Sequence, residues 1–232
     1  MPRARIVSVV GGSGGIGASV LTCSLAVNAM GRVLALDGRP FGGGLDVVLG
    51  LDEAPGLRWP DLAEAAGAIE AGRLLNSLPS GPMSVLSFDR RRPHQPAVDT
   101  IRRVVHALAE HVDLVLVDAP RPGEENFLPI SDLCDDIIYL AGAGICEMAS
   151  AIAGTAALAD CAATGWLVVR RRRGYGDLPQ ALAASLDLPL LGSVPEDRKV
   201  EDLLDSGGMP GQVGSLRRSA RELLEGLDLA CR

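Results

Sequence analysis

A glycine-rich segment, VVGGSGGIGASV, holds the residues whose types and spacing point most directly to chemistry. Gly12, Gly17 and Ser19 match the phosphate-binding pattern G-x-x-x-x-G-K-[ST], in which backbone N–H groups wrap a phosphate and the last hydroxyl binds Mg²⁺. The lysine position of that pattern holds Ala18. We therefore predict a phosphate-binding loop that lacks the ammonium group needed to neutralise the β- and γ-phosphates.

The same loop also fits a second class of enzyme. Residues 11–17 carry the glycine spacing of short-chain dehydrogenases, and Asp37 ends an apolar run at the point where an acidic residue would bind a ribose. Those enzymes use a Tyr-x-x-x-Lys pair as their acid/base unit. Neither Tyr139 nor Tyr175 is followed by a lysine four positions later. An NAD(P)-dependent oxidoreductase is therefore the second candidate.

Seven short apolar runs predict the strands that would position these residues. They lie at residues 6–10, 33–36, 84–88, 114–117, 137–140, 166–169 and 190–193, and they are continuous rather than alternating, as in buried parallel strands. Helical patterns separate them at residues 18–30, 68–78, 97–110, 146–159, 177–186 and 199–205, and another covers 216–227. We predict an α/β fold: a single open, mostly parallel twisted sheet of about seven strands with helices on both faces, in one domain over residues 1–232.

Composition and charge indicate which ligands and which cell compartment to expect. The formal net charge of −7 argues against a nucleic-acid binder driven by overall charge. The basic runs at residues 90–92 and 170–173 are expected in exposed loops. Five cysteines without a CxxC pair or a metal spacing indicate a reducing cytosol. No apolar run reaches the roughly 20 residues that a transmembrane helix needs.

With the glycine loop, Asp37 and the run DLVLVDAP in place, the chain resembles the ParA/MinD superfamily of deviant Walker-type P-loop proteins. Within that superfamily it looks most like the CpaE/TadZ-like group. The run DLVLVDAP is similar to a Walker B strand and ends in Asp118. The phrase PGLRWPDL at residues 55–62 resembles actinobacterial septum-site-determining proteins of this group.

The resemblance implies a P-loop NTPase-like fold, ATP or ADP as the cofactor, and Mg²⁺. It assigns the metal to Ser19 and Asp118, and catalytic roles to Asp37 and Asp118. The nucleotide would contact Gly12, Ser13, Gly14, Gly15, Ile16, Gly17, Ala18, Ser19 and Arg170.

The chain departs from the family pattern at four functional positions. The two family lysines are replaced by Ala18 and Ser13, the second acid after Asp37 is Arg39, and an asparagine that reads adenine is Arg170. Losing one charge contact of a transition state costs about 3 kcal/mol, so several losses together predict almost no ATP turnover.

The resemblance therefore implies a degenerate ParA/MinD-like protein with weak or vestigial nucleotide binding. Its role would be the positioning of the division septum or of pilus or secretion machinery. Its partners would be proteins of those machines and a second copy of itself, and its location the cytoplasm, at the inner membrane only through partners. The alternative is a residual ATPase in which Arg39 supplies the missing charge. The degenerate protein predicts that Arg39→Ala changes nucleotide affinity little, and the residual ATPase predicts a loss.

Overall fold

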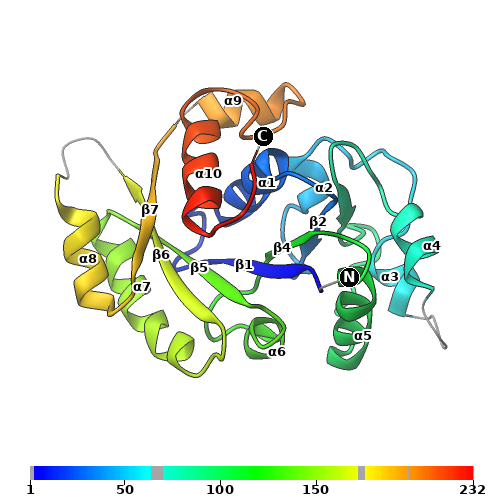
Figure 1. Ribbon diagram of the computed structural model, residues 1–232, viewed down its shortest axis with the longest axis horizontal. Coiled ribbons are helices and arrows are strands. Elements are labelled where there is room, and N and C mark those ends of the chain that lie inside the picture. Colours follow the sequence, from blue (N-terminus) through cyan, green and yellow to red (C-terminus); the bar gives the residue numbers. More distant parts are fainter. Residues whose placement is uncertain (1–2, 64–69, 172–175, 198, 232) are drawn as a thin grey trace.

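The computed structural model describes residues 3–63, 70–171, 176–197 and 199–231. One parallel sheet of seven strands runs through it (Figure 1). The strands are β1 (Arg5–Gly11), β2 (Val33–Asp37), β3 (Ser84–Leu86), β4 (Leu114–Asp118), β5 (Asp136–Gly142), β6 (Thr164–Arg171) and β7 (Leu190–Pro195). Each expected run is a strand, so the predicted fold class is confirmed.

The strand order decides between the two enzyme classes that share the glycine spacing. The order is β3-β2-β4-β1-β5-β6-β7, so β4 lies between β1 and β2 and pairs with both. In a dinucleotide-binding sheet the first strand lies next to the second. The inserted strand β4 instead brings its last residue, Asp118, beside the end of β1. The oxidoreductase alternative is therefore not favoured.

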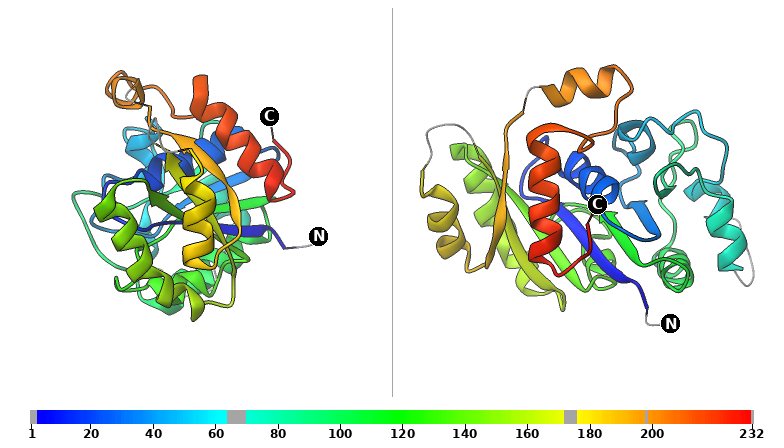
Figure 2. Two further views of the ribbon diagram at one scale, coloured as in Figure 1. Left: turned by 90° about the vertical axis from the view of Figure 1, so that its left-hand side faces the viewer. Right: turned by 45° about the horizontal axis from the view of Figure 1, so that its top comes forward.

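Helices cover both faces of the sheet (Figure 2). They are α1 (Ala18–Asn28), α2 (Leu45–Val48), α3 (Trp59–Ala63), α4 (Ala71–Asn76), α5 (Val98–Ala109), α6 (Phe127–Ser131), α7 (Ile145–Ala159), α8 (Leu178–Leu186), α9 (Lys199–Asp205) and α10 (Gly214–Gly226). The helices α1, α2 and α10 pack on one face, and α5, α6, α7 and α8 pack on the other. Within the described ranges, no helix is both long and apolar enough to cross a membrane.

The two faces of the sheet carry two separate aliphatic cores. Neighbouring residues of one strand point to opposite cores: Leu34 and Leu36 pack with α5, whereas Ala35 packs with α1 and α2. Since both faces are buried, apolar residues occupy every position of β2 and β4 except the aspartates at their ends. This is why the strands could be recognised as continuous runs.

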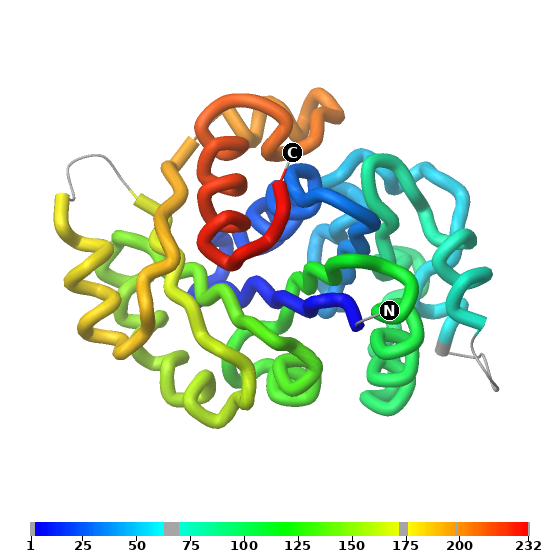
Figure 3. The backbone as a smooth tube through the Cα atoms, in the orientation of Figure 1, coloured from blue at the N-terminus to red at the C-terminus, as the bar shows by residue number. Residues whose placement is uncertain are grey.

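The helix predictions are confirmed for the helices of six residues or more. The helices α2, α3 and α6, each of five residues or fewer, were not predicted. The strand β6 continues through Arg170 and Arg171, so the prediction of a loop there is wrong, and residues 172–175 of that segment lie outside the described residues. The last residues of the chain lie beside the segment that follows α1, where Met30 N–H donates to Ala230 O at 3.0 Å (Figure 3).

Trp59 ties the segment after α2 to the end of the sheet. Its side chain is 1% exposed, and its indole N–H donates to the Asp37 carbonyl at 2.8 Å. We predict that Trp59→Phe lowers the free energy of unfolding by about 1–3 kcal/mol, because a buried carbonyl loses its donor and a cavity remains. Urea unfolding measures the change. Phe41→Leu, at a side chain that is 85% exposed, is the control and should change stability by less than about 0.5 kcal/mol. Equal stability of Trp59→Phe and the parent protein would contradict the prediction.

Candidate phosphate-binding site

The glycine loop lies between β1 and α1, where the sequence predicts it. Gly15 and Gly17 adopt positive φ angles of 71° and 98°, a backbone region that glycine enters without steric cost. The start of the loop is anchored on both sides: Gly12 N–H donates to Leu140 O at 2.9 Å, and Ser150 Oγ donates to Gly12 O at 2.6 Å. The loop is therefore held at the carboxyl edge of β1, at the N-terminus of an 11-residue helix that favours anions.

Ser19 and Asp118, the two expected metal ligands, are in direct contact, and a third residue joins them. Ser19 Oγ donates to Asp118 Oδ2 at 2.6 Å. Nη2 of Arg39 donates to Ser19 Oγ at 2.6 Å and to Asp118 Oδ2 at 2.7 Å. The Asp118 side chain is 2% exposed and that of Arg39 is 29% exposed, so this is a largely buried ion pair. The guanidinium occupies the position between the hydroxyl and the carboxylate.

The turn after β2 directs Arg39 to this place. Asp37 and Asp118 are paired in register at the ends of β2 and β4. Gly38 N–H donates to Asp118 O at 2.9 Å, and a Cβ on Gly38 would lie only 2.9 Å from that same oxygen. The close approach therefore requires glycine, and it sets the next residue, Arg39, beside Asp118.

Charge and burial act on the pair in opposite directions. Burial raises the pKa of Asp118, while the charge of Arg39 and the hydrogen bonds from Ser19 and Arg39 oppose that rise. Burial alone would lower the pKa of Arg39, but the neighbouring Asp118 carboxylate outweighs it and raises that pKa. Arg39 is therefore charged at all physiological pH values.

Asp37, expected to be catalytic, faces the turn and not the loop. Its Oδ1 accepts Arg39 N–H at 3.0 Å, and its Oδ2 accepts Leu45 N–H at 3.2 Å and Ser87 Oγ at 3.0 Å. It is 2% exposed. These contacts give Asp37 the role of a turn-forming residue that positions Arg39.

Arg170, expected near an adenine, lies against the backbone of the glycine loop. Its Nη1 donates to Ile16 O at 3.2 Å and to Gly15 O at 3.5 Å, and its Nη2 lies 3.6 Å from Glu196 Oε1. The structure therefore brings Arg170 together with the loop, through carbonyl groups and not through the N–H groups that bind phosphate.

Comparison with known proteins adds a sequence relationship. No protein-family model matches the chain. Two uncharacterized proteins from two strains of Mycobacterium tuberculosis are each 30% identical to it over 223 residues. The match covers 96% of this chain and 63% of each relative, so the chain spans less than two thirds of the length of the relatives it matches.

Solved structures show the fold. The ParA family ATPase from Chlorobium tepidum has a TM-score of 0.81 at 16% identity, over 96% of this chain and 98% of that one. The septum site-determining protein MinD from Pyrococcus horikoshii, complexed with Mg-ADP, has a TM-score of 0.76 at 23% identity, over 97% and 96% of the two chains. The MinC:MinD cell division protein complex of Aquifex aeolicus has a TM-score of 0.76 at 20% identity, over 96% of each chain.

The chain has the fold of the MinD and ParA ATPases. Those neighbours raise the question of whether its residues fit Mg²⁺. Ser19 uses its proton on Asp118 and accepts a hydrogen bond from Arg39, and Asp118 Oδ2 accepts two hydrogen bonds. A guanidinium that close would repel a second cation. Asp118 Oδ1 is buried without a hydrogen-bond partner among the described residues, but Arg39 already neutralises this carboxylate. The residues present therefore do not fit a magnesium ion while Arg39 holds this position.

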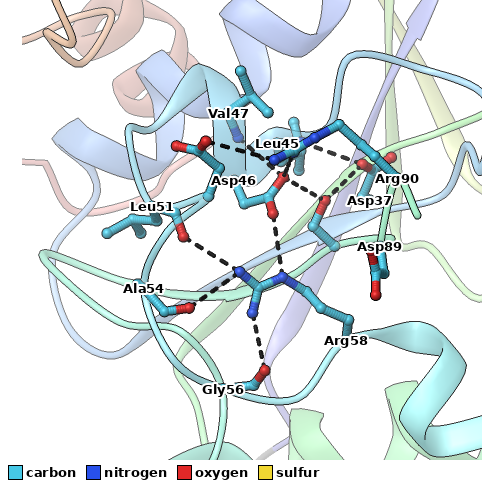
Figure 4. Close-up of polar contacts among 12 residues, drawn as sticks. Asp37, Leu45, Asp46, Val47, Leu51, Ala54, Gly56, Arg58, Asp89 and Arg90 are labelled. Atoms are coloured by element: carbon cyan, nitrogen blue, oxygen red, sulfur yellow. Dashed lines mark hydrogen bonds and ion pairs between the residues drawn. The ribbon is translucent and has the colours of Figure 1, made fainter. Parts of the chain in front are cut away.

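A second buried polar network shares Ser87 with Asp37, and the sequence did not reveal it (Figure 4). Asp46 is 2% exposed and accepts from Arg58 Nε at 3.2 Å and from Ser87 Oγ at 3.1 Å, with Arg90 Nη1 at 3.5 Å. Arg58 also donates to three backbone carbonyls, those of Leu51, Ala54 and Gly56. No spacing rule could have joined these residues, since 44 positions separate Asp46 from Arg90. Arg90 thus lies in an exposed loop as predicted, but it pairs with a buried acid.

The adjacent acids Asp135 and Asp136 each accept hydrogen bonds from groups of the protein itself. Asp135 accepts from Arg3 at 2.5 Å and from Ile6 N–H at 2.8 Å, and Asp136 accepts from Arg5 at 2.7 Å and from Trp166 at 2.8 Å. Among the described residues, no group of three or more His, Cys, Asp or Glu side chains could hold a metal ion.

Asp37 makes a testable contribution to the pH dependence of stability. Burial and the charge of Asp118 raise the pKa of Asp37 to about 7, against the hydrogen bonds from Arg39 N–H, Ser87 and Leu45 N–H. The folded state therefore binds a proton that the unfolded state releases near pH 4, roughly the ordinary pKa of Asp. The resulting stability is complete below about pH 4 and is lost as pH rises through about 7.

We predict that Asp37→Asn, which cannot ionise, reduces this loss of stability between about pH 5 and about pH 7.5, by at most about 1.4 kcal/mol per pH unit. Urea unfolding at both pH values measures the slope. Asp61 and Asp89, whose pKa values are lowered, titrate below this window and do not interfere. Asp99→Asn, at an exposed acid, should leave the slope as it is. An unchanged slope in Asp37→Asn would show that this carboxyl is ionised throughout.

Proposed function

We propose that the chain is a ParA/MinD-like protein of the CpaE/TadZ-like group that positions division-septum, pilus or secretion machinery through protein contacts, without ATP turnover. Its fold supports the proposal, since its neighbours include a MinD protein and a MinC:MinD cell division complex. The finer placement is supported by PGLRWPDL, in which Arg58 and Trp59 are buried against the ends of β2 and α2. The mycobacterial relatives agree with a resemblance to actinobacterial proteins.

The proposed loss of ATP turnover rests mainly on one observation, the contact of Arg39 with Ser19 and Asp118. An active P-loop ATPase places a Mg²⁺ ion between such groups and a lysine on the phosphates. Here a guanidinium lies between them, and Ala18 has no charge to offer. The metal ion and the lysine are the two sources of positive charge that stabilise the transition state, and this site differs from an active one at both.

The same contact favours a residual ATPase as the second candidate. Arg39 is a cation within hydrogen-bond distance of the helix residue that follows the missing lysine, and an arginine can stabilise charge on a γ-phosphate. The two candidates differ in turnover.

Partners, oligomeric state and location are part of the proposal. We propose partners from the division, pilus or secretion apparatus, and a cytoplasmic protein that reaches the membrane only through them. We also propose a homodimer whose formation does not depend on ATP, because Ser13 replaces the lysine with which family dimers clamp the nucleotide. Light scattering with and without ATP measures that dependence.

We predict that the purified protein shows no Mg²⁺-dependent ATP turnover above background, because Ala18 and Arg39 remove the charges that turnover needs. Phosphate release with and without EDTA is the measurement, and Ser19→Ala is the control for the site. Turnover that disappears in Ser19→Ala would overturn the proposal and establish the residual ATPase.

We predict that a fluorescent fusion of the full-length protein forms foci at division sites or cell poles in its own host. Ser19→Ala should form the same foci, because placement depends on protein contacts and not on turnover. A signal spread evenly through the cell would contradict the positioning role. Foci that vanish in Ser19→Ala would instead link placement to the nucleotide site.

A further inference from the structure

A cavity of about 400 Å³ opens beside the glycine loop, between the turn after β2 and the segment after β4. The residues of its wall that matter here are Gly14, Arg39, Gln95, Arg121, Glu124 and Glu125. Gly14 belongs to the loop, and Arg39 separates the cavity from Ser19 and Asp118. The cavity therefore adjoins both the loop and the buried ion pair.

Several buried donors around this cavity have no acceptor. Nε of Arg39, Nε2 of Gln95 and Oγ of Ser13 are inaccessible to solvent and have no hydrogen-bond partner within the part of the chain that the structure describes. A buried polar atom without a partner is costly, and native proteins nearly always satisfy such atoms. Two of these donors belong to residues of the cavity wall and the third group belongs to the adjacent loop, so acceptor oxygens would complement them. The same region holds one unmet acceptor, Asp118 Oδ1.

The wall of the cavity is balanced in charge, so the glycine loop beside it decides which ligand is favoured. Arg39 and Arg121 contribute two guanidinium groups, and Glu124 and Glu125 contribute two carboxylates. Glu124 is engaged by Arg121, through the backbone N–H at 2.8 Å and through Nε at 2.7 Å, and Glu125 is exposed. The N-terminus of α1 adds its positive dipole end at the loop. A phosphate group at the loop would meet this dipole end, and its oxygens can accept hydrogen bonds from backbone N–H groups.

The buried ion pair explains how such a site could work without a metal. In P-loop proteins, the ion held by the loop hydroxyl and the Walker B carboxylate neutralises the phosphate. Nη2 of Arg39 contacts both of these groups here, and its Nε remains free of protein partners within the described residues. Nη2 thus replaces the metal's protein contacts, while the Arg39 side chain also forms part of the cavity wall.

We propose that Arg39 is a tethered cation in the place of Mg²⁺, and that the loop and its cavity bind a phosphate group without a metal. The inference rests on the proposed loss of Mg²⁺-dependent turnover, but neither of its tests measures turnover. Inorganic pyrophosphate and ADP share the chemistry, and the experiment distinguishes them.

The first test asks whether Arg39 excludes the metal, and its readout is the melting temperature with and without millimolar Mg²⁺ at constant ionic strength. The parent protein should not respond to Mg²⁺. Arg39→Ala should melt about 5 °C lower or more, because a buried carboxylate loses its cation, and Mg²⁺ should recover part of that loss. Arg39→Lys keeps a tethered cation and should not respond. Asp118→Asn added to Arg39→Ala should abolish the response.

A Mg²⁺ response of the parent protein equal to that of Arg39→Ala would overturn the proposal. So would an Arg39→Ala protein that folds and is insensitive to Mg²⁺. If Arg39→Ala does not fold, Arg39→Gln, which keeps a donor but no charge, takes its place with the same expected outcomes.

The second test measures ligand binding by calorimetry, with ADP or with inorganic pyrophosphate, in EDTA and then in Mg²⁺. The parent protein should bind in EDTA, and Mg²⁺ should not strengthen binding. Arg39→Ala should lose about tenfold or more in EDTA, which corresponds to one charge-assisted hydrogen bond. This replaces the small change that the sequence alone predicts for the degenerate protein, because the structure places Arg39 against Ser19 and Asp118. Arg102→Ala, at an exposed arginine on α5, is the matched control and should bind as the parent does.

Tighter binding of ADP than of pyrophosphate would identify a nucleotide as the ligand, and equal binding would identify the phosphate group alone. Binding that needs Mg²⁺, or no binding of either probe, would overturn the proposal. The proposed loss of turnover stands or falls separately, on phosphate release from ATP.

Discussion

The pairing of β4 between β1 and β2 is the constraint on which the site depends. It places Asp118 in register with Asp37 on one side and with Val9, two residues before the glycine loop, on the other. Three chain segments that are far apart in the sequence therefore end at one edge of the sheet. The carboxylate of Asp118 is buried there and needs a counter-charge. The nearest residue that can supply it is two positions beyond the end of β2, which is where Arg39 stands.

Buried acids recur around this edge, and each one organises a segment of backbone. Asp37 holds the turn that carries Arg39, and Asp46 holds the chain around Arg58 through a shared contact with Ser87. Removing one partner from such a network leaves an unpaired buried charge, which is far more costly than the pair itself is stabilising. The turn after β2 is thus held in one arrangement by the protein's own side chains, without help from a ligand.

The sheet could be predicted from the sequence because burial on both faces leaves a local signal in every strand. The short helices α2 and α6 could not, because four or five residues carry no readable period. The loop with Ser19 was recognisable by spacing, and Asp118 by the resemblance of its strand to a Walker B strand. The position of Arg39 was not, because a long side chain after a turn can point in several directions. The deciding facts are the close approach of Gly38 to β4 and the carboxylate of Asp37, which both arise from strand pairing. For the same reason the resemblance implied a catalytic role for Asp37, whereas its carboxylate accepts hydrogen bonds from the turn.

The substitutions that separate this loop from the family pattern are consistent with one another in charge. The pattern has a lysine at position 18 and an acid at position 39, and this chain has Ala18 and Arg39. One cation is lost at the start of α1, and one is gained beside the next residue, Ser19. A lysine at position 18 together with Arg39 would place two cations in one site, where they would repel each other. An acid at position 39 would place a second carboxylate against the buried Asp118 with no metal to separate them. Ala18 thus avoids repulsion with Arg39, and Arg39 supplies the positive charge that Ala18 lacks. The two substitutions together form one compensated change in the placement of positive charge in the site.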